Sequence, residues 1–364
     1  MRVLQVFAEP LLYGGQESAI MNFYSAIDRE RFQFDFFTPY EAGNNEMLKR
    51  IEEVGGRVFA QNKPFEDRRR KYYFISELTG FLSRHNYEIV HINSGSSFAL
   101  AKGAQICRKA GVKKVIVHSH ATGVDNLKHK VVRTLYDPYF IKYPDYCLGC
   151  SEDVIRYRYP KVVSEKCRVI YNGIDTDKFR FNKEVRLSKR KELGIEKEFV
   201  LGSVGRLSPE KNPLFVIEVF KEILHRDPSA KLLMIGSGSM KVDVERRIMD
   251  ADIDDSVIML ENRSDISDLM CAMDAFVLPS IFEGFGMVAI EAQCSDLPCV
   301  CSLGIPERIK IASTFKRISL TEGAPKWCDL IMGSRQSIRK VENAIQGSAF
   351  DIQKCVHELE LLYE

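Results

Sequence analysis

The sequence contains no apolar run that approaches the roughly 20 residues needed to cross a bilayer as a helix. We therefore expect no transmembrane helix. The apolar stretch at residues 3–7 is too short for the core of a secretory leader and predicts a first β-strand instead. Low-complexity segments and internal repeats are not visible either, which argues against a disordered chain and against a solenoid.

An excess of charge of either sign is also missing. The 52 Lys and Arg residues nearly balance the 50 Asp and Glu residues, so nothing in the overall charge predicts a nucleic-acid partner. The 10 cysteines show no disulfide-framework spacing, which predicts reduced thiols in a cytosolic protein. Cys147 and Cys150 form one C-x-x-C pair, but no second pair follows at the spacing of a zinc site.

A chain of 364 residues is long enough for two or more domains, each with its own core. Both halves alternate short apolar strands with helical segments, which predicts parallel α/β domains that bind ligands beyond the carboxyl ends of their strands. We predict strands at residues 3–7, 32–38, 58–60, 89–92 and 115–117 in the first half, and at residues 199–204, 231–235, 257–260, 275–278 and 298–301 in the second. Two more helices are predicted near the end, at residues 337–347 and 350–363.

The most informative stretch lies at residues 282–293, where a glycine-punctuated loop leads from a strand into a helix. Such a loop turns backbone N–H groups and the positive end of a helix toward a phosphate. Glu283 lies in the loop and Glu291 in the helix, and carboxylates accept hydrogen bonds from pairs of sugar hydroxyls. Two acids at this spacing are also typical of solvated positions, but the glycines and the preceding strand favour a binding site.

A second motif follows the strand at residues 199–204, where Arg206 and Lys211 bracket a loop that leads into a helix. A guanidinium binds two phosphate oxygens at once, and an ammonium adds a point charge. A diphosphate leaving group needs such neutralisation as its charge grows in the transition state. The alternative is a loop of surface ion pairs.

Two loops of the first half are further candidates. Gly14 and Gly15 follow the first strand, where backbone without side chains can approach a ligand; the alternative is a simple turn. The pattern is not G-x-G-x-x-G, so the dinucleotide-binding fingerprint is absent. His118 and His120 end another strand with the same side parity, so both can face one site, although a lone histidine is more often structural.

These motifs resemble those of the retaining glycosyltransferases of family 4, which have the GT-B fold. The second half has the family's E-x7-E signature in the context P-S-x-x-E-G-F-G at residues 279–291, and its G-R-x-x-x-x-K-N motif at residues 205–212. The first half has G-G-x-E at residues 14–17 and N-G-I-D at residues 172–175. The resemblance therefore covers nearly the whole chain.

The resemblance implies an α/β protein of the GT-B fold, with two doubly wound Rossmann-like domains that face an interdomain cleft. Residues 1–185 would form the acceptor-side domain, and residues 186–347 the domain that binds the nucleotide sugar. Residues 348–364 would form a helix that crosses back to the first domain. No metal and no cofactor are expected, since the nucleotide sugar is a substrate.

The resemblance also implies roles for the candidate residues of the second half. Arg206 and Lys211 would bind the donor diphosphate, Glu283 the transferred sugar and Glu291 the ribose. Backbone N–H groups of the glycine loop would assist at the phosphate, namely those near Phe285, Gly286 and Met287. Glu261 replaces the usual glycine after the strand at residues 257–260, which leaves the contact with the nucleobase open.

In the first half, the resemblance places the loop of Gly14 and Gly15 near the donor phosphates and the acceptor. His120 is our first choice, and His118 our second, for the histidine that family members have close to the reacting sugar. Its expected role is polar contact with the donor sugar.

The expected reaction is transfer of a sugar, with retention, from a UDP-sugar to a saccharide or lipid-linked saccharide in cell-surface polysaccharide biosynthesis. One alternative is a GT-B epimerase that acts on a nucleotide sugar without an acceptor. A second is a non-catalytic protein that binds a nucleotide sugar, against which the intact candidate residues argue.

The basic run at residues 68–71 and the basic and aromatic segment at residues 128–143 are typical of solvated or packed helices. The alternative is contact with anionic lipid headgroups or with an acidic acceptor. We expect a cytoplasmic protein, to which the lipid interpretation would add peripheral contact with the inner face of the cell membrane.

Overall fold

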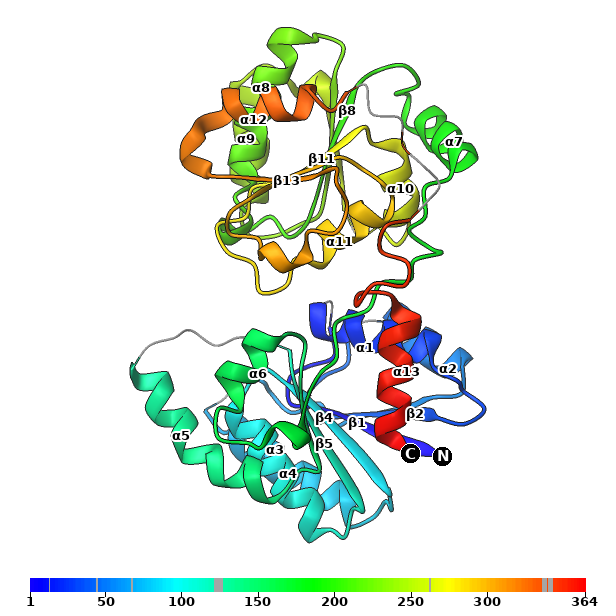
Figure 1. Ribbon diagram of the computed structural model, residues 1–364, viewed down its shortest axis with the longest axis vertical. Coiled ribbons are helices and arrows are strands. Elements are labelled where there is room, and N and C mark those ends of the chain that lie inside the picture. Colours follow the sequence, from blue (N-terminus) through cyan, green and yellow to red (C-terminus); the bar gives the residue numbers. More distant parts are fainter. Residues whose placement is uncertain are drawn as a thin grey trace. The chain divides into compact units, whose positions relative to one another are not determined.

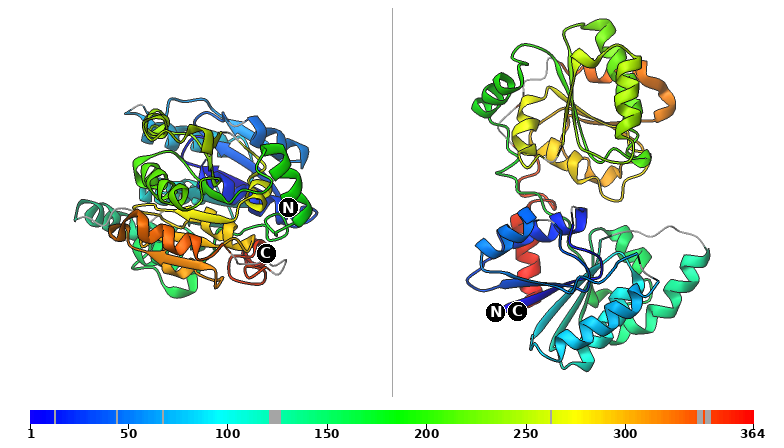
Figure 2. Two further views of the ribbon diagram at one scale, coloured as in Figure 1. Left: turned by 90° about the horizontal axis from the view of Figure 1, so that it is seen from above. Right: turned by 180° about the vertical axis from the view of Figure 1, so that it is seen from behind.

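The computed structural model describes residues 1–364 apart from residues 13, 44, 67, 121–126, 262, 336–338 and 340–342, and apart from the side chains of residues 127–133. The chain divides into two compact units, one formed by Met1–Gly173 with Ile352–Glu364 and the other by Ile174–Asp351. In each unit a twisted sheet is covered by helices on both faces (Figures 1 and 2).

The first unit is built on a seven-stranded sheet of order β3-β2-β1-β4-β5-β6-β7 whose neighbouring strands are parallel. The strands are β1 (Arg2–Phe7), β2 (Gln33–Thr38), β3 (Arg57–Ala60), β4 (Ile89–Ser94), β5 (Lys114–Ser119), β6 (Tyr146–Gly149) and β7 (Cys167–Val169). The helices are α1 (Gly15–Ala26), α2 (Asn45–Glu53), α3 (Arg70–Leu82), α4 (Ser97–Lys109), α5 (Leu127–Lys142), α6 (Glu152–Arg158) and α13 (Ile352–Tyr363).

The alternation of side chains along β1 explains why both faces of this sheet are covered. Val3 and Phe7 belong to a core with residues of α1, α2 and α13, whereas Leu4 and Val6 belong to a core with residues of α3, α4 and α5. Strands buried on both faces are continuous apolar runs, as predicted for this segment. The last helix of the chain, α13, lies beside α1 (Figure 1).

The second unit is built on a six-stranded sheet of order β10-β9-β8-β11-β12-β13, again parallel. The strands are β8 (Val200–Val204), β9 (Lys231–Ile235), β10 (Val257–Leu260), β11 (Ala275–Leu278), β12 (Cys299–Ser302) and β13 (Phe315–Ile318). The helices are α7 (Lys183–Leu193), α8 (Pro213–Arg226), α9 (Lys241–Asp250), α10 (Ile266–Ala272), α11 (Met287–Cys294) and α12 (Gly323–Met332). Residues of α8, α9 and α12 form the core on one face, and α10 and α11 lie on the other (Figure 1).

The predicted domain boundary at residue 185 differs from the division at Gly173 and Ile174. The segment after Ile174 is held within the second unit because its carbonyl groups accept side-chain hydrogen bonds there. Asn343 Nδ2 donates to Thr176 O at 2.9 Å, and Ser295 Oγ donates to Phe179 O at 2.8 Å. The predicted change at residue 347 likewise differs from the observed division after Asp351.

The helix predicted at residues 337–347 falls largely outside the described residues, and its described end at residues 343–347 contains a turn instead of a helix. The following predicted helix, at residues 350–363, agrees with α13 to within two residues at its start. This helix belongs to the first unit, although the residues before it belong to the second.

Candidate functional site

The strand order of the second unit reverses between β8 and β11. The chain runs outward from β8 to β10 on one side and from β11 to β13 on the other. The loops that follow β8 and β11 therefore diverge at the carboxyl edge of the sheet, which is where open α/β sheets bind ligands. The two strongest sequence motifs occupy these two loops.

Glycines fix the loop after β8 against the loop after β9. Gly205 N donates to Ile235 O, and Leu207 N donates to Ser237 O, both at 2.9 Å. A Cβ atom on Gly236 would lie 2.0 Å from Gly205 O, and one on Gly238 would lie 2.3 Å from Leu207 O. The backbone that carries Arg206 is thus held by a contact that only glycine permits.

We expect Gly236→Ala to destabilise the second unit by more than about 3 kcal/mol, because the new methyl group meets a backbone oxygen and φ is +144°. Trp327 is the single tryptophan of the chain and is buried in the core of this unit, so its fluorescence during urea unfolding measures the effect. Gly284→Ala is the matched control, because a Cβ atom there meets nothing within 4 Å. Equal midpoints for the two variants would contradict the close contact.

The loops after β8 and β11 are joined by backbone and side chains. Ile281 N donates to Glu210 O at 2.8 Å. Lys211 Nζ forms an ion pair with Glu283 Oε1, which also accepts a hydrogen bond from Ser280 Oγ at 3.0 Å. The side chain of Glu283 is 10% exposed and that of Lys211 24%, so the pair is largely sheltered from solvent. The structure therefore brings together a cation and an acid that stand 72 residues apart in the sequence.

A third loop, after β12, supports the position of Glu283. Glu283 N donates to Gly304 O at 3.1 Å, and Ser302 Oγ donates to Ser280 O. A Cβ atom on Gly304 would lie 2.4 Å from Ile281 O, so the two loops touch through backbone. The sequence patterns did not identify Ser280 and Ser302 as supports of this kind.

The glycine loop ends at the N-terminus of α11. Gly286 precedes the helix with φ of +79°, and no side chain caps this terminus. Phe285 is buried and packs edge-on against Phe350, with ring centroids 5.6 Å apart. Gln293 anchors the other end of the helix, because its side chain donates to Ile309 O and accepts from Ala312 N. The helix terminus, with Met287 as its first residue, is therefore fixed and open to an anion.

Glu291 lies inside α11, and burial raises its pKa to about 7, while the nearby Lys178 lowers it in part. Near neutral pH this carboxyl group is therefore only partly ionised. Lys178 comes from the segment after the division between the units, and the sequence patterns did not identify it as a neighbour of this acid.

Arg206 is exposed on the loop after β8. It forms no ion pair within the part of the chain that the structure describes, in contrast to Lys211. The same loop carries Glu210, whose pKa is lowered chiefly by the nearby Ser208 side chain and, to a lesser extent, by the charge of Arg206. The structure thus leaves Arg206 exposed to solvent, on the same loop as Lys211.

In the first unit, Gly14 caps the start of α1 and Gly15 is its first residue. The carboxylate of Glu17 folds over this turn, since a Cβ atom on Gly14 would lie 2.3 Å from Glu17 Oε2. Gln16 Nε2 donates to Asn93 O at 3.4 Å, which ties the turn to the end of β4. The predicted glycine loop therefore lies at the carboxyl edge of this sheet.

His120 lies just after β5, and its Nε2 atom is 3.0 Å from Asn93 Oδ1. Burial lowers the pKa of His120 to about 3, so its imidazole is neutral. His118 is fully buried, and its ring lies between those of His91 and His120, with centroids 5.4 and 4.1 Å away. Of the two candidates, His120 is the one at the strand end, where a ligand can be reached.

A buried polar network, which no sequence pattern predicted, supports His120. Asn93 Nδ2 donates to Gln5 Oε1 at 2.9 Å, and Gln5 Nε2 donates to the hydroxyl of Tyr363 at 3.1 Å. The same hydroxyl lies 2.7 Å from His91 Nδ1. Gln5 and His91 are polar residues within apolar strands, a pattern that indicates buried hydrogen bonds. The pattern does not identify their partner on α13, Tyr363.

Among the residues whose placement is described, no three His, Cys, Asp or Glu side chains gather into a set that could hold a metal ion. The ten cysteines all lie in the described part of the chain and form no disulfide. No described helix combines the length and the apolar composition that a membrane span requires.

Comparison with known protein families assigns both halves of the chain. Residues 13–178 match the family described as Glycosyltransferase Family 4, and residues 185–315 match the family described as Glycosyl transferases group 1. EpsF of Bacillus subtilis, which carries the name of a glycosyltransferase, is 27% identical over 100% of this chain and 96% of its own length. The UDP-Gal:alpha-D-GlcNAc-diphosphoundecaprenol alpha-1,3-galactosyltransferase of Escherichia coli is 32% identical over 63% of this chain and 61% of its own.

Solved structures share the fold. HepE of Anabaena, in complex with UDP-glucose, has a TM-score of 0.76 at 18% identity and covers 100% of this chain and 99% of its own. WaaG, described as a glycosyltransferase involved in lipopolysaccharide biosynthesis, has a TM-score of 0.69 at 15% identity, with 98% and 99% covered. These likenesses confirm the predicted fold class, and the two family matches confirm the resemblance found in the motifs. The chain belongs to the family 4 glycosyltransferases, enzymes of the GT-B fold that use nucleotide sugars.

Proposed function

We propose that the chain transfers a sugar, with retention of anomeric configuration, from a UDP-sugar to a saccharide or lipid-linked saccharide acceptor. The observation that carries this proposal is the pairing of Lys211 with Glu283 at the switch point of the second unit, next to the open terminus of α11. A sugar diphosphate has a charged end and a hydroxyl-rich end. A cation and a carboxylate side by side suit these two ends.

In the proposed complex, the donor diphosphate lies against Lys211 and the N–H groups at the start of α11. Charge grows on the leaving oxygen as its bond to the anomeric carbon breaks, and Lys211 neutralises it together with Arg206. Glu283 exchanges its contact with Lys211 for hydroxyl groups of the sugar. Glu291 accepts hydrogen bonds from the ribose hydroxyls. The Gly14 and Gly15 turn and the neutral His120 supply the first unit's polar contacts with the donor.

The names of the relatives support the classes of donor and acceptor. The E. coli relative is named for a UDP-galactose donor and for a sugar linked to diphosphoundecaprenol as acceptor, and HepE was solved with UDP-glucose. WaaG is described as acting in lipopolysaccharide biosynthesis. We extend these classes to this chain and propose that it works in cell-surface polysaccharide assembly, at the inner face of the cell membrane, without a metal ion.

We expect the affinity for the donor to rise between pH 6 and pH 8 and then to level off. The carboxyl group of Glu291 has a pKa of about 7 in the free protein, and ribose hydroxyls donate to its ionised form. Each pH unit below that pKa therefore weakens binding by up to about tenfold. Calorimetric titration measures this affinity, with the intact nucleotide sugar as the ligand. A free nucleotide diphosphate would be unsuitable, because its terminal phosphate itself titrates at about pH 6.

The matched control for this pH dependence is Glu291→Gln, which keeps the size of the side chain and cannot ionise. This variant should bind the donor more weakly than the parent protein at pH 8, and its affinity should be nearly constant between pH 6 and pH 8. A slope in the variant equal to that of the parent would assign the titration to another group.

A screen of nucleotide sugars for thermal stabilisation, followed by transfer assays with a radiolabelled donor, tests the proposed function. A ligand that binds only the folded protein raises its melting temperature, and we expect a UDP-sugar to do so. Product formed only with an acceptor, with its anomeric configuration unchanged by NMR, supports the proposal. Conversion of the donor without any acceptor would indicate an epimerase, and stabilisation without turnover would indicate a binding protein.

A further inference from the structure

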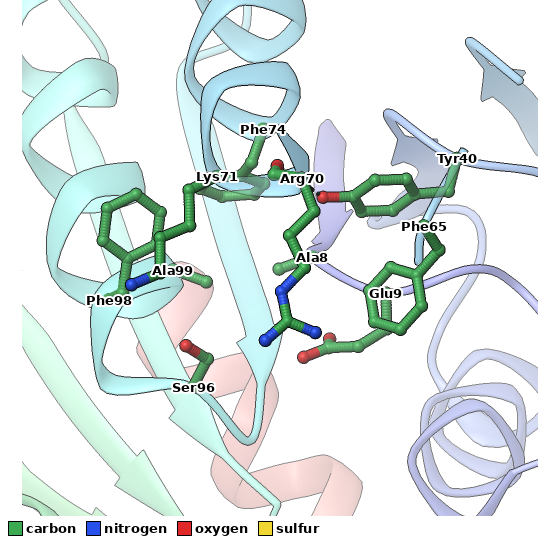
Figure 3. Close-up of a pocket in the computed structure, with 10 residues that line it drawn as sticks. All are labelled: Ala8, Glu9, Tyr40, Phe65, Arg70, Lys71, Phe74, Ser96, Phe98 and Ala99. Carbon is green, nitrogen blue, oxygen red and sulfur yellow. Dashed lines mark hydrogen bonds between the residues drawn. The ribbon is translucent and has the colours of Figure 1, made fainter. Parts of the chain in front are cut away.

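The first unit has a pocket at its own switch point, where the strand order reverses between β1 and β4. The pocket has a volume of about 140 Å³ and is formed by the loops after these strands, the first turn of α3 and the start of α4 (Figure 3). Whole small-molecule sites have roughly 300–1,000 Å³. The pocket therefore has room for one group of a larger ligand.

Two cations line the pocket, and both come from the basic run whose purpose the sequence left open. Arg70 and Lys71 lie in the first turn of α3, and the described residues contain no acid that pairs with either of them. Their charged ends lie over aromatic rings instead, with Arg70 Cζ 5.8 Å from the Phe65 ring centroid and Lys71 Nζ 5.1 Å from that of Phe98. The Tyr40 hydroxyl donates to Arg70 O at 2.8 Å and thereby fixes the start of the helix.

Two helix N-termini meet at the same pocket. Arg69 precedes α3 and Ser96 precedes α4, and neither side chain caps its helix. Both helices have 13 residues, so each contributes a developed partial positive charge at its start. The two termini and the two cations together make the pocket electropositive.

Glu9 is the exception to this charge, and it points into the pocket opposite Arg70 (Figure 3). Its Oε1 atom accepts from Ser94 Oγ at 2.7 Å. Its Oε2 atom is buried and accepts no hydrogen bond from the residues that the structure describes. Burial raises the pKa of Glu9 to about 7, and the Ser94 hydrogen bond and the nearby Gln16 side chain lower it in part. A buried carboxyl oxygen without a partner in the protein can accept a hydrogen bond from a hydroxyl group of a ligand.

We propose that this pocket binds an anionic sugar unit of the acceptor. The phosphate or carboxylate of that unit lies on Arg70 and Lys71 at the two helix termini, one of its hydroxyl groups donates to Glu9 Oε2, and its apolar ring face lies on Phe98. Naming this unit as part of the acceptor rests on the proposed function. The binding of an anionic sugar by the pocket does not.

Ligand-observed NMR on the full chain tests this proposal with three sugars that share one ring: glucose 1-phosphate, glucuronate and glucose. A nucleotide diphosphate is present in excess to occupy the donor site. We expect at least one of the two anionic sugars to bind at least tenfold more tightly than glucose, and which of them binds identifies phosphate or carboxylate as the anion. Equal binding of all three, or binding of none, would overturn the proposal.

The variants separate the pocket from the general charge of the basic run. Arg70→Ala should weaken binding of the preferred anionic sugar at least tenfold, and Glu9→Gln should weaken it with a melting temperature close to that of the parent. Arg68→Ala is the matched control, because it removes the same charge from the same run outside the pocket, and it should change binding less than twofold. If Arg70→Ala and Arg68→Ala caused equal losses, either of sugar binding or of sedimentation with anionic vesicles, the basic run would contact a membrane surface. That result would overturn the proposal.

The nucleotide sugar is titrated against the same variants. Arg70→Ala should bind it as the parent protein does, because Arg70 is not among the groups proposed to contact the donor. Absence of nucleotide-sugar binding in the parent would count against the proposed function alone. If the parent protein did not prefer an anionic sugar to glucose, that result would count against the proposed pocket alone.

Discussion

Lys211→Ala should lower kcat/KM for the donor by about 100-fold to 1,000-fold, the loss seen when one preorganised stabiliser of developing charge is removed. The Lys211 ammonium is largely sheltered beside Glu283 at the switch point, and charge interactions are stronger there than in solvent. Removal also leaves the Glu283 carboxylate without its cation. We therefore expect donor affinity and turnover to fall together. Steady-state kinetics and calorimetric titration of the donor measure the two effects.

Lys221→Ala is the matched control for this loss. Lys221 forms an i,i+3 ion pair with Glu218 at 3.7 Å on the surface of α8, the helix that follows the Lys211 loop. Surface pairs of this kind contribute about 0–1 kcal/mol. The control variant should keep kcat/KM within about twofold of the parent. A comparable loss in both variants would mean that net charge, and not the position of Lys211, supports catalysis.

Glu283→Gln should lower kcat about 100-fold and change donor affinity much less. The amide keeps the shape of the side chain and can still accept from Ser280 Oγ, but it lacks the charge that holds Lys211 and that stabilises a sugar becoming electron-poor. An interaction made chiefly in the transition state lowers kcat and kcat/KM to the same extent. Single-turnover kinetics with saturating donor separate this loss from weaker binding.

Glu307→Gln provides the comparison for Glu283→Gln. Glu307 lies in the same unit, on the loop after β12, with its side chain 82% exposed and 3.4 Å from Arg317. Its substitution should leave kcat unchanged. If Glu283→Gln raised KM tenfold and kept kcat, Glu283 would serve donor binding in the ground state, and its proposed role would be wrong.

Sequence patterns predicted the parts of the fold that carry strong local signals. Strands buried on both faces, such as β1 and β8, are continuous apolar runs and were predicted to within a residue or two. The edge strand β13 was missed, because its sequence, Phe-Lys-Arg-Ile, shows little apolar signal. The domain boundary was placed at residue 185, since a charged connector does not reveal that carbonyl groups at Thr176 and Phe179 are bound by the second unit.

The site was predictable to the extent that motifs mark strand ends. Lys211 and Glu283 each follow a buried strand, but their contact depends on β8 and β11 being neighbours, with β9 and β10 on the far side. The strand order is a property of the whole sheet, and neither motif predicts it. The raised pKa of Glu291 depends on burial, which local sequence does not specify.

In the first unit, too, contacts between distant residues could not be predicted from local sequence. Tyr363 lies 358 residues from Gln5, so its place in the network behind His120 follows from the return of α13 to the first unit. The pocket of Glu9 and Arg70 likewise joins a strand end to a helix start that no spacing pattern links. The basic run at residues 68–71 was visible in the sequence. The sequence did not show that only Arg70 and Lys71 of this run line the pocket.

A crystal structure with an intact UDP-sugar tests the central claim most directly. We predict the diphosphate within hydrogen-bond distance of Lys211 Nζ and of backbone N–H groups at the start of α11, with the sugar against Glu283 and the ribose against Glu291. A well-ordered nucleotide sugar bound away from the loops after β8 and β11, with the Lys211–Glu283 pair left intact, would contradict it.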